Sequence, residues 1–346
     1  MSIIKLHTKQ PDNSPIFIIG PPRSGTTLTA KIIGKHSRIF MPGETHFFTD
    51  IYARREEIGH LDNIDAKDKV LNRLLSLYKR YNEPPDQARV DTLLLSLNAK
   101  KELQKKWNGY ESVFTSFMEL QTHSEKKTRW GNNAPRDLFF LDEIFTFYPN
   151  AKCILCVRDA RDFLVSYKSR FRVTAQEQKN RISKLYHPVI SSFLWKSSVS
   201  RITSALMTKS NKNVFLLKYE DLVTSPETTV PEVCSFIGES FEDSMLEVST
   251  HNSSGDAPKS GIFSSSIGRW KNELSADEVY ILHKIAGKEM VKLGYTLETV
   301  NPDLFKVAGD FLLSPFILFR ALKANKDVSG PIYPYLKRRL TTLLKS

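Results

Sequence analysis

Residues 16–28, Ile-Phe-Ile-Ile-Gly-Pro-Pro-Arg-Ser-Gly-Thr-Thr-Leu, join a short apolar run to a glycine-bounded loop and then to a helical pattern. Strand, loop and helix in this order form a phosphate-binding loop. Gly20 and Gly25 bracket four residues, as in the triphosphate loop G-x-x-x-x-G-K-[ST]. However, Thr26 stands where that loop carries lysine, and the cation, Arg23, lies inside the loop. The stretch therefore predicts a site for a phosphate-like group without the triphosphate lysine.

The start of the helix is expected to bind an anion with several oxygens. Backbone N–H groups of Ser24 to Thr27 should point into the loop, where the helix dipole adds partial positive charge. The Thr26 and Thr27 hydroxyls add further donors. The alternative is an ordinary turn rich in Gly, Ser and Pro, but the order of strand, loop and helix favours the anion site.

A second element follows at residues 152–166, Lys-Cys-Ile-Leu-Cys-Val-Arg-Asp-Ala-Arg-Asp-Phe-Leu-Val-Ser. It has the pattern of a buried strand followed at once by a helix, so its charged residues should lie at the carboxyl edge of an open α/β sheet, where ligands bind. Arg158 is expected to bind phosphate, because a guanidinium fork matches a phosphate dianion. The alternative is a solvated helix start held by ion pairs, and this is the role expected for Arg161 and Asp162.

Residues 21–28, Pro-Pro-Arg-Ser-Gly-Thr-Thr-Leu, resemble the 5′-phosphosulfate loop of sulfotransferases that use 3′-phosphoadenosine 5′-phosphosulfate (PAPS). The arginine form resembles the tyrosylprotein and related bacterial branch, and the resemblance covers about residues 15–295. It implies that Arg158 and Ser166 hold the 3′-phosphate of the cofactor. It also implies that the loop residues bind the cofactor: Arg23, Ser24, Gly25, Thr26, Thr27 and Leu28.

Residues 38–46, Arg-Ile-Phe-Met-Pro-Gly-Glu-Thr-His, resemble the Gly-Glu-Glu-Thr stretch of tyrosylprotein sulfotransferases. The glutamate that serves there as general base falls on Glu44. Sulfuryl transfer requires removal of the hydroxyl proton, and a partly desolvated carboxylate can accept it. His46 is the second candidate for the base, or else a polar residue at a helix start. His36 and His123 have no motif context and are predicted to lie on the surface.

Later segments supply further cofactor contacts by resemblance. Tyr219, at the end of an apolar strand, matches a family position near the adenosine, whereas Glu220 and Asp221 are expected to cap the following helix. Arg269, in the stretch from Ser264 to Leu274 that resembles the late cofactor loop, is expected to close over the 3′-phosphate with Lys271. Trp270 packs either on adenine or in the core.

One position departs from the family pattern. Residues 130–136, Trp-Gly-Asn-Asn-Ala-Pro-Arg, place Asn133 where related enzymes commonly carry a lysine near the transferred group. An amide donates hydrogen bonds but brings no charge, so stabilisation of the transition state falls more heavily on Arg23 and the loop N–H groups.

Composition favours a globular enzyme: 40% of the 346 residues are hydrophobic and 25% are charged. The net charge of +12 fits an anionic cofactor and also an anionic acceptor or membrane surface. Nucleic acid is not expected as a partner, since no basic helix carries interleaved aromatics and no zinc spacing is present. Cys153 and Cys156 fall inside a strand pattern and are predicted to be small core residues. No metal site is expected.

The predicted fold is an α/β, P-loop-type parallel sheet flanked by helices. Strands are expected at 16–20, 152–157 and 213–218, and helices at 26–36, from Pro135 to about Tyr148, and at 188–210. Residues 1–300 form the predicted sulfotransferase domain. It includes a helical insert at about 46–125 that shapes the acceptor pocket.

The remaining segments carry separate expectations. Residues 251–266, rich in Ser and Gly, are predicted to form a mobile lid. Residues 301–346 are a basic, apolar extension, for which we expect a helix pair docked on the domain; peripheral membrane contact and a homodimer are the alternatives. The first fifteen residues lack a hydrophobic signal core, which favours a cytoplasmic protein, with or without peripheral attachment to the membrane.

The sequence thus predicts transfer of a sulfuryl group from PAPS to an acceptor hydroxyl by in-line displacement, with adenosine 3′,5′-bisphosphate (PAP) as product. Glu44 and Arg23 are the predicted catalytic residues. A saccharide, a lipid, a small alcohol or a tyrosine would each fit as carrier of the hydroxyl. The alternatives are a P-loop kinase, which would require ATP and Mg²⁺, and a non-catalytic protein that binds PAP or PAPS.

Overall fold

The computed structural model of the protein describes residues 12–81, 84–169, 186–209, 212–248 and 261–324. Within these ranges, a five-stranded parallel sheet has the order β2-β3-β1-β4-β5. Its strands are β1 (Ile16–Ile19), β2 (Ile39–Phe40), β3 (Arg129–Asn133), β4 (Lys152–Val157) and β5 (Val214–Lys218). The predicted parallel α/β sheet is therefore confirmed.

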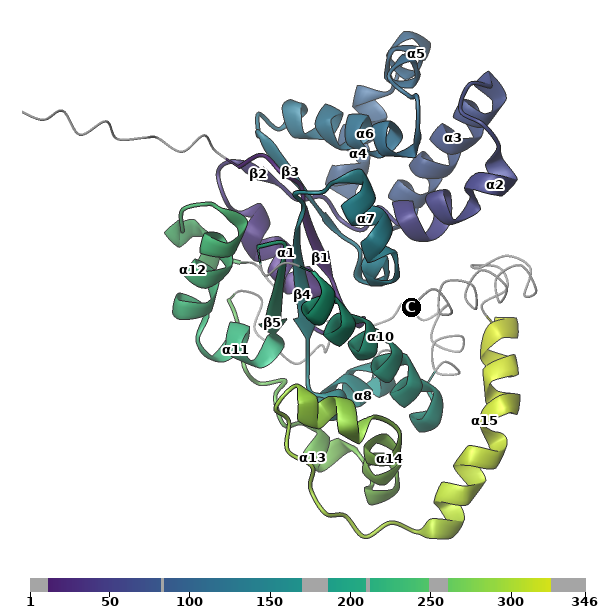
Figure 1. Ribbon diagram of the computed structural model, residues 1–346, viewed down its shortest axis with the longest axis vertical. Helices are drawn as coiled ribbons and strands as arrows, with labels where there is room; N and C mark the ends of the chain where they lie inside the picture. Colours follow the sequence, from purple (N-terminus) through teal and green to yellow (C-terminus); the bar gives the residue numbers. More distant parts are fainter. Residues whose placement is uncertain (1–11, 82–83, 170–185, 210–211, 249–260, 325–346) are drawn as a thin grey trace, which may run out of the picture.

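Helices pack on both faces of the sheet (Figure 1). Around the sheet the α-helices are α1 (Thr26–Gly34), α7 (Leu141–Phe147), α8 (Ala160–Lys168), α10 (Pro188–Thr208), α11 (Tyr219–Thr224), α12 (Pro226–Ile237), α13 (Trp270–Glu273), α14 (Ala276–Lys292) and α15 (Leu304–Ala324). Two 3-10 turns, η3 (Pro135–Phe140) and η5 (Asp243–Leu246), complete this part. The helix expected from Pro135 thus begins as a 3-10 turn and becomes α-helical at Leu141.

Alternating side chains of the strands feed two separate cores. Phe17 and Ile19 join α10, α14 and the residues of the insert, whereas Ile16 and Ile18 pack with α1 and α12. Such two-sided burial explains the continuous apolar runs of β1 and β4. Cys153, Cys156 and Cys234 are buried, as predicted for the first two, so they act as small core residues.

Strands β2 and β3 were absent from the prediction. The Arg-Trp-Gly-Asn-Asn sequence of β3 has no apolar run, yet all five residues are buried. They are buried because β3 pairs with β1 and β2 and because Arg129 finds polar partners. Tertiary pairing therefore overrides a polar sequence at this position.

The range 46–125 is helical, as expected for the insert. It contains the π-helix η1 (Phe47–Ile51), the 3-10 turn η2 (Tyr52–Arg54), α2 (Arg55–Ile58), α3 (Ile64–Tyr81), α4 (Pro84–Leu93), α5 (Leu97–Lys105) and α6 (Tyr110–Ser124). Aromatic rings join it to the sheet: Phe47 stacks on Phe114 with centroids 4.5 Å apart, and Phe114 contacts Phe17 and Trp130. The insert is thus anchored to the edge of the sheet that carries β3.

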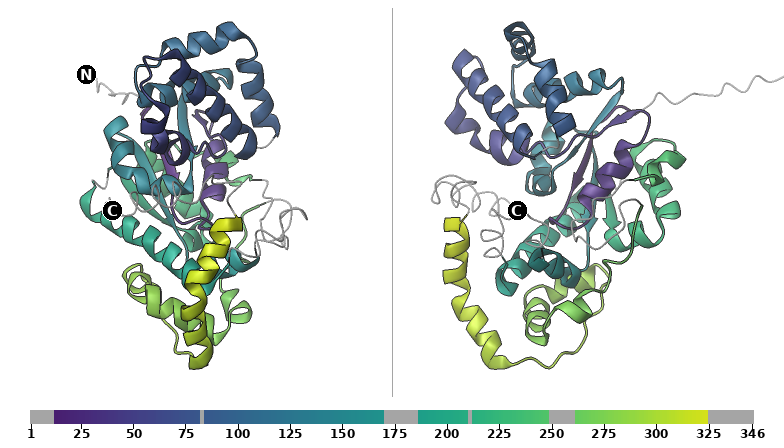
Figure 2. Two further views of the ribbon diagram at one scale, coloured as in Figure 1. Left: turned by 90° about the vertical axis from the view of Figure 1, so that its right-hand side faces the viewer. Right: turned by 180° about the vertical axis from the view of Figure 1, so that it is seen from behind.

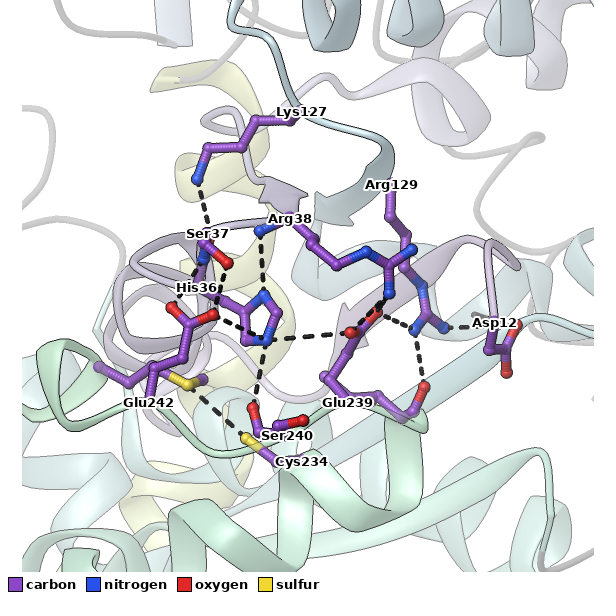
Figure 3. A network of polar contacts seen from close by, with 12 residues as sticks. Asp12, His36, Ser37, Arg38, Lys127, Arg129, Cys234, Glu239, Ser240 and Glu242 are labelled. Atoms are coloured by element: carbon purple, nitrogen blue, oxygen red, sulfur yellow. Dashed lines mark hydrogen bonds and ion pairs between the residues drawn. The ribbon is translucent and has the colours of Figure 1, made fainter. Parts of the chain in front are cut away.

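A buried polar network closes the amino-terminal edge of the sheet (Figure 3). Arg129, fully buried, donates to Ile237 O at 2.7 Å and to Glu239 Oε1 at 3.0 Å. His36 lies between Glu239 and Glu242, and its Nδ1 accepts the Arg38 N–H at 3.1 Å. His36 is 2% exposed, so its predicted surface position is wrong, whereas His123 is exposed as expected.

Helix α15 stands at the outer edge of the molecule (Figures 1 and 2). We expected a docked helix pair in residues 301–346. The structure describes one helix of this region, α15, and residues 325–346 lie outside the described part of the chain. Residues 251–260 of the predicted lid also lie outside it. Among the described residues, no helix is long and apolar enough to cross a membrane.

Candidate active site

Two glycines are required by the geometry of the loop between β1 and α1. A Cβ added to Gly20 would lie 2.2 Å from the Cys156 carbonyl oxygen, and one added to Gly25 would lie 2.6 Å from Cδ2 of Tyr219. Arg23 has φ 72° and Gly25 has φ 87°, so the loop passes twice through the left-handed region. The chain thereby comes close to β4 on one side and to the ring of Tyr219 on the other.

Arg158 follows β4 and is surrounded by residues from distant segments. Its Nη2 donates to Ser266 O at 2.6 Å, and its Nη1 donates to Arg23 O at 3.4 Å. The guanidinium carbon lies 4.4 Å from the centroid of the Tyr219 ring. The indole N–H of Trp195 binds the Arg158 carbonyl oxygen at 3.0 Å. Arg158 is thus held at the carboxyl edge of the sheet, as the sequence predicted.

Two further bonds complete this cluster. Arg23 Nε donates to Ser166 Oγ at 2.9 Å, and the hydroxyls of Tyr219 and Ser266 are 2.6 Å apart. The structure therefore brings together four residues that were predicted from separate motifs: Arg23, Arg158, Ser166 and Tyr219. Ser266 was missed, because its contact with Arg158 is made by a backbone carbonyl, which no residue type encodes.

Three buried polar atoms near this cluster have no hydrogen-bond partner among the described residues. They are Ser24 Oγ, Asn133 Oδ1 and Arg158 Nε. Buried polar groups are normally paired, so orphans gathered at the ends of β1, β3 and β4 indicate a site for a polar ligand. Ser24 Oγ and Arg158 Nε can donate to the oxygens of a bound anion, whereas Asn133 Oδ1 can only accept a hydrogen bond.

The start of α1 differs in detail from the expectation. The Ser24 N–H donates to Pro21 O at 3.3 Å, so it stabilises the loop instead of pointing into it. Thr26 is buried, Thr27 is exposed and Leu28 is partly buried at the first turn of α1. The N–H groups of Gly25 to Thr27 remain at the N-terminus of the helix, where anions are favoured.

Glu44 and His46 lie together in the segment between β2 and η1. Glu44 Oε2 is 3.0 Å from His46 Nε2. Between them, Thr45 donates from its hydroxyl to Asn132 Oδ1 at 2.9 Å, which ties the segment to β3. The two candidates for the proton acceptor are therefore in contact with each other, and β3 positions both.

Asp137 extends this polar connection into the interior. Asn132 Nδ2 donates to Asp137 Oδ2 at 2.9 Å, and the carboxyl group is fully buried. Burial raises the pKa of Asp137 well above its ordinary value, against the bond from Asn132, and the Glu44 charge raises it further. A buried carboxyl group with a raised pKa is thus coupled to the charge of Glu44. No motif signalled it, because Asp137 resembles an ordinary first-turn acid.

Other predicted residues have different contacts. Arg269 pairs with Glu273, with Nη2 and Oε1 2.7 Å apart. Trp270 is buried beneath Arg161, whose guanidinium carbon lies 4.1 Å from the centroid of the Trp270 ring system, so the core alternative for Trp270 is confirmed. Lys271 lies 3.7 Å from Glu298.

The acidic residues near Arg158 are structural, although not as solvated pairs. Asp159 pairs with buried Arg161 at 2.6 Å, while Asp162 accepts the N–H groups of Gly268 and Trp270. Glu220 and Asp221 lie in the first turn of α11, as expected, and the Glu220 carboxylate also accepts the Asp159 N–H at 2.9 Å. Burial raises the pKa values of Asp162 and Glu220. These carboxyl groups join the ends of β4 and β5 to the loop before α13.

A hollow of about 550 Å³ lies at the opposite edge of the sheet, lined by residues that include Ser14, Lys152 and Asn213. These residues lie at or just before the amino ends of β1, β4 and β5. No cluster of His, Cys, Asp or Glu suited to a metal occurs in the described ranges.

Comparison with known proteins shows the relationship. Residues 15–243 match the model of a family described as the sulfotransferase family. The chain is 24% identical over 273 residues to an uncharacterized protein of Aquifex aeolicus, covering 75% of this chain and 31% of that protein. It is also 24% identical over 238 residues to protein-tyrosine sulfotransferase 2 of Gallus gallus, covering 67% and 53%. The chain thus spans about a third to a half of the length of these relatives.

Among solved structures, the sulfotransferase domain from the curacin biosynthetic pathway is similar, with a TM-score of 0.53. The match covers 83% of this chain and 100% of that chain, at 18% identity. At this identity the likeness concerns the fold, and it agrees with the parallel sheet described above.

Proposed function

The chain belongs to the sulfotransferase family, and on this premise we propose that it transfers a sulfuryl group from PAPS to an acceptor hydroxyl. The observation that carries the proposal is the cluster of Arg23, Arg158, Ser166 and Tyr219 at the carboxyl edge of the sheet, beside buried polar atoms without partners. A cradle of this kind suits a nucleotide that carries two separate anionic groups.

Each residue has a role in this proposal. Arg158 and Ser166 bind the 3′-phosphate, and Arg23 with the N–H groups of Gly25 to Thr27 binds the 5′-phosphosulfate. Tyr219, held by Arg158 and Ser266, lies beside the nucleoside. Arg269 joins the 3′-phosphate by leaving its present partner, Glu273.

The chemistry is an in-line displacement at sulfur. The acceptor oxygen forms a bond to sulfur while the bond from sulfur to the phosphate oxygen breaks, and PAP leaves. Glu44 takes the hydroxyl proton, with His46 in contact to accept a hydrogen bond or share the proton. Arg23 and the loop N–H groups stabilise the developing negative charge, since Asn133 supplies no cation.

Isothermal titration of PAP against the purified chain tests the donor site. We expect affinity on the order of micromolar for PAP, no comparable affinity for ATP with Mg²⁺, and a loss of about thirtyfold or more in Arg158→Ala. Arg201→Ala is the matched control, because Arg201 pairs with Asp142 on α7. Tighter binding of ATP, or binding of neither nucleotide, would overturn the proposal and favour a kinase or another ligand.

Turnover separates an enzyme from a protein that only binds PAP. In Glu44→Gln, PAP binding should persist while release of PAP from the donor, with an accepted hydroxyl compound present, falls by about a hundredfold or more. Full turnover in this variant, with loss in His46→Asn, would assign the base to His46. If the unaltered chain binds PAP but turns over no acceptor, Asn133→Lys tests whether the missing cation is the cause.

A further inference from the structure

Helix α15 carries a large apolar surface that no described residue covers. Phe305 is 92% exposed, Leu312 80% and Phe316 65%. Leu304, Phe311, Leu313, Leu318 and Phe319 are exposed as well. Monomeric proteins rarely expose a contiguous apolar patch of this size, so we expect α15 to contact a further partner.

The exposed residues share one side of the helix. At about 100° per residue, Leu304, Phe311, Phe319, Leu312, Phe305 and Phe316 fall within about half of the circumference. The opposite side rests on the body, where Val307 is buried and Asp310 lies 3.4 Å from His187 at the start of α10. We call the exposed side of Leu304, Phe305, Phe311, Leu312, Phe316 and Phe319 the outer face of α15.

The outer face is suited to lie at the surface of a membrane and is too short to span one. Residues 311–319, Phe-Leu-Leu-Ser-Pro-Phe-Ile-Leu-Phe, carry no charge, but Asp310 and Arg320 border them on both sides. Nine helical residues rise about 14 Å, half of the roughly 30 Å of a hydrocarbon core. Helices with a broad apolar face of this length lie in the plane of a lipid surface.

The basic residues of this part of the chain favour a lipid surface over a second copy of the chain as the partner of the outer face. Lys306, Arg320 and Lys323 are exposed on α15, and residues 325–346 add Lys326, Lys337, Arg338, Arg339 and Lys345 against a single acid, Asp327. A second copy packed against α15 would bring Lys306, Arg320 and Lys323 near their own counterparts in a chain of net charge +12. Anionic headgroups complement them, at about 1 kcal/mol for each basic residue near the surface.

From these observations we propose that α15 docks the protein on an anionic membrane surface, with its outer face inserted between headgroups and acyl chains. The His187–Asp310 contact and the buried Val307 keep the helix attached to α10 and α14 while its outer face binds lipid. The docking depends on neither the donor nor the acceptor of the proposed reaction.

Co-sedimentation of the full chain with vesicles tests the proposal. The vesicles are phosphatidylcholine alone or phosphatidylcholine mixed with phosphatidylglycerol. We expect binding to the mixed vesicles that weakens with salt, and a loss of about thirtyfold or more in the double variant Leu312→Ser/Phe316→Ser. The control is Leu95→Ser/Leu97→Ser, whose leucines, just before and at the start of α5, are 82% and 68% exposed, against 80% and 65% for the α15 pair.

Several outcomes would overturn the proposal. Equal binding of the two double variants would place lipid contact elsewhere, and equal binding to both vesicle types would remove the role of anionic lipid. Analytical ultracentrifugation covers the remaining case. An unaltered chain that ignores vesicles and sediments as a dimer, with Leu312→Ser/Phe316→Ser monomeric, would assign the outer face to a second copy; a monomer that ignores vesicles would equally end the lipid assignment.

Discussion

Gly25 occupies a position that a side chain cannot share with Tyr219. In Gly25→Ala, the new Cβ would meet Cδ2 of Tyr219 at 2.6 Å, in a residue with φ 87°. Moving the ring would disturb its contact with Arg158, so we expect PAP affinity to fall about tenfold or more and the free energy of unfolding to fall by about 2–3 kcal/mol.

Gly59→Ala is the matched control for this substitution. Gly59 has φ 98°, close to that of Gly25, and a Cβ there would meet nothing within 4 Å. Backbone strain alone should cost it about 1–2 kcal/mol and leave PAP affinity unchanged. Titration and urea unfolding of both variants measure the difference, and equal effects would show that the Tyr219 contact has no influence.

Asp137 should make the stability of the fold depend on pH. Its unfolded carboxyl group ionises near pH 4, whereas burial raises the pKa in the folded chain well above that value. Between these two pKa values the folded chain binds more protons, so the free energy of unfolding decreases as pH rises, by at most about 1.4 kcal/mol per pH unit. Asp137→Asn should remove this slope, as measured by urea unfolding between about pH 5 and pH 8. An unchanged slope would mean that another group causes it.

The sequence could predict site residues that belong to motifs and could not predict their supports. Arg158 and Ser166 follow a buried strand at a fixed spacing, and Gly25 belongs to a loop whose shape demands it. Asp137 and Ser266 act through burial and through a carbonyl oxygen, which depend on how distant segments meet. The types of the residues alone do not indicate which distant segments come into contact.

At the scale of elements, the network in Figure 3 joins the chain before β1, the turn after α1, the start of β3 and the end of α12. Its centre is the pair of Arg129, fully buried, and Glu239, whose side chain is 4% exposed. Glu239→Gln would leave a buried guanidinium without its nearest counter-charge. We expect the free energy of unfolding to fall by about 3 kcal/mol, measured by urea unfolding.

Glu242 provides the comparison within the same network. Its side chain is 31% exposed and it binds Ser37 and His36. Because solvent screens this carboxylate, Glu242→Gln should cost about 1 kcal/mol or less. Equal losses in the two variants would show that burial of the Arg129 pair contributes nothing beyond a surface contact.

The same network explains why β3 was not predicted from the sequence. β3 begins with Arg129 and ends with two asparagines, which is the composition of a loop. The charge of Arg129 is neutralised by Glu239, 110 residues away, and the Asn132 amide binds Thr45 and Asp137. By contrast, β1, β4 and β5 were predictable, because apolar runs suffice for a strand buried on both faces.

Over the whole molecule, the candidate site draws on the carboxyl edge of the sheet, whereas helix α15 lies at the periphery (Figure 2). The contacts of the candidate site described above run from Arg23 to Ser266, whereas the outer face begins at Leu304, so the two features belong to different parts of the chain. The net charge of +12 favours the anions proposed for both: a nucleotide at the site and lipid headgroups at α15. The proposals for the two surfaces can therefore fail independently.

The contact of Arg158 with Ser266 and Tyr219 also fixes when the site can appear during synthesis. Arg23 and Ser166 leave the ribosome first, but Ser266 lies 108 residues after Arg158, and Tyr219 is placed only when β5 pairs with β4. Contacts between such distant positions can form only after both partners have been synthesised, and closing the long loop between them slows folding. A nascent chain therefore cannot complete the proposed nucleotide site before Ser266 has been synthesised, so affinity for PAP would report that β5 has joined the sheet.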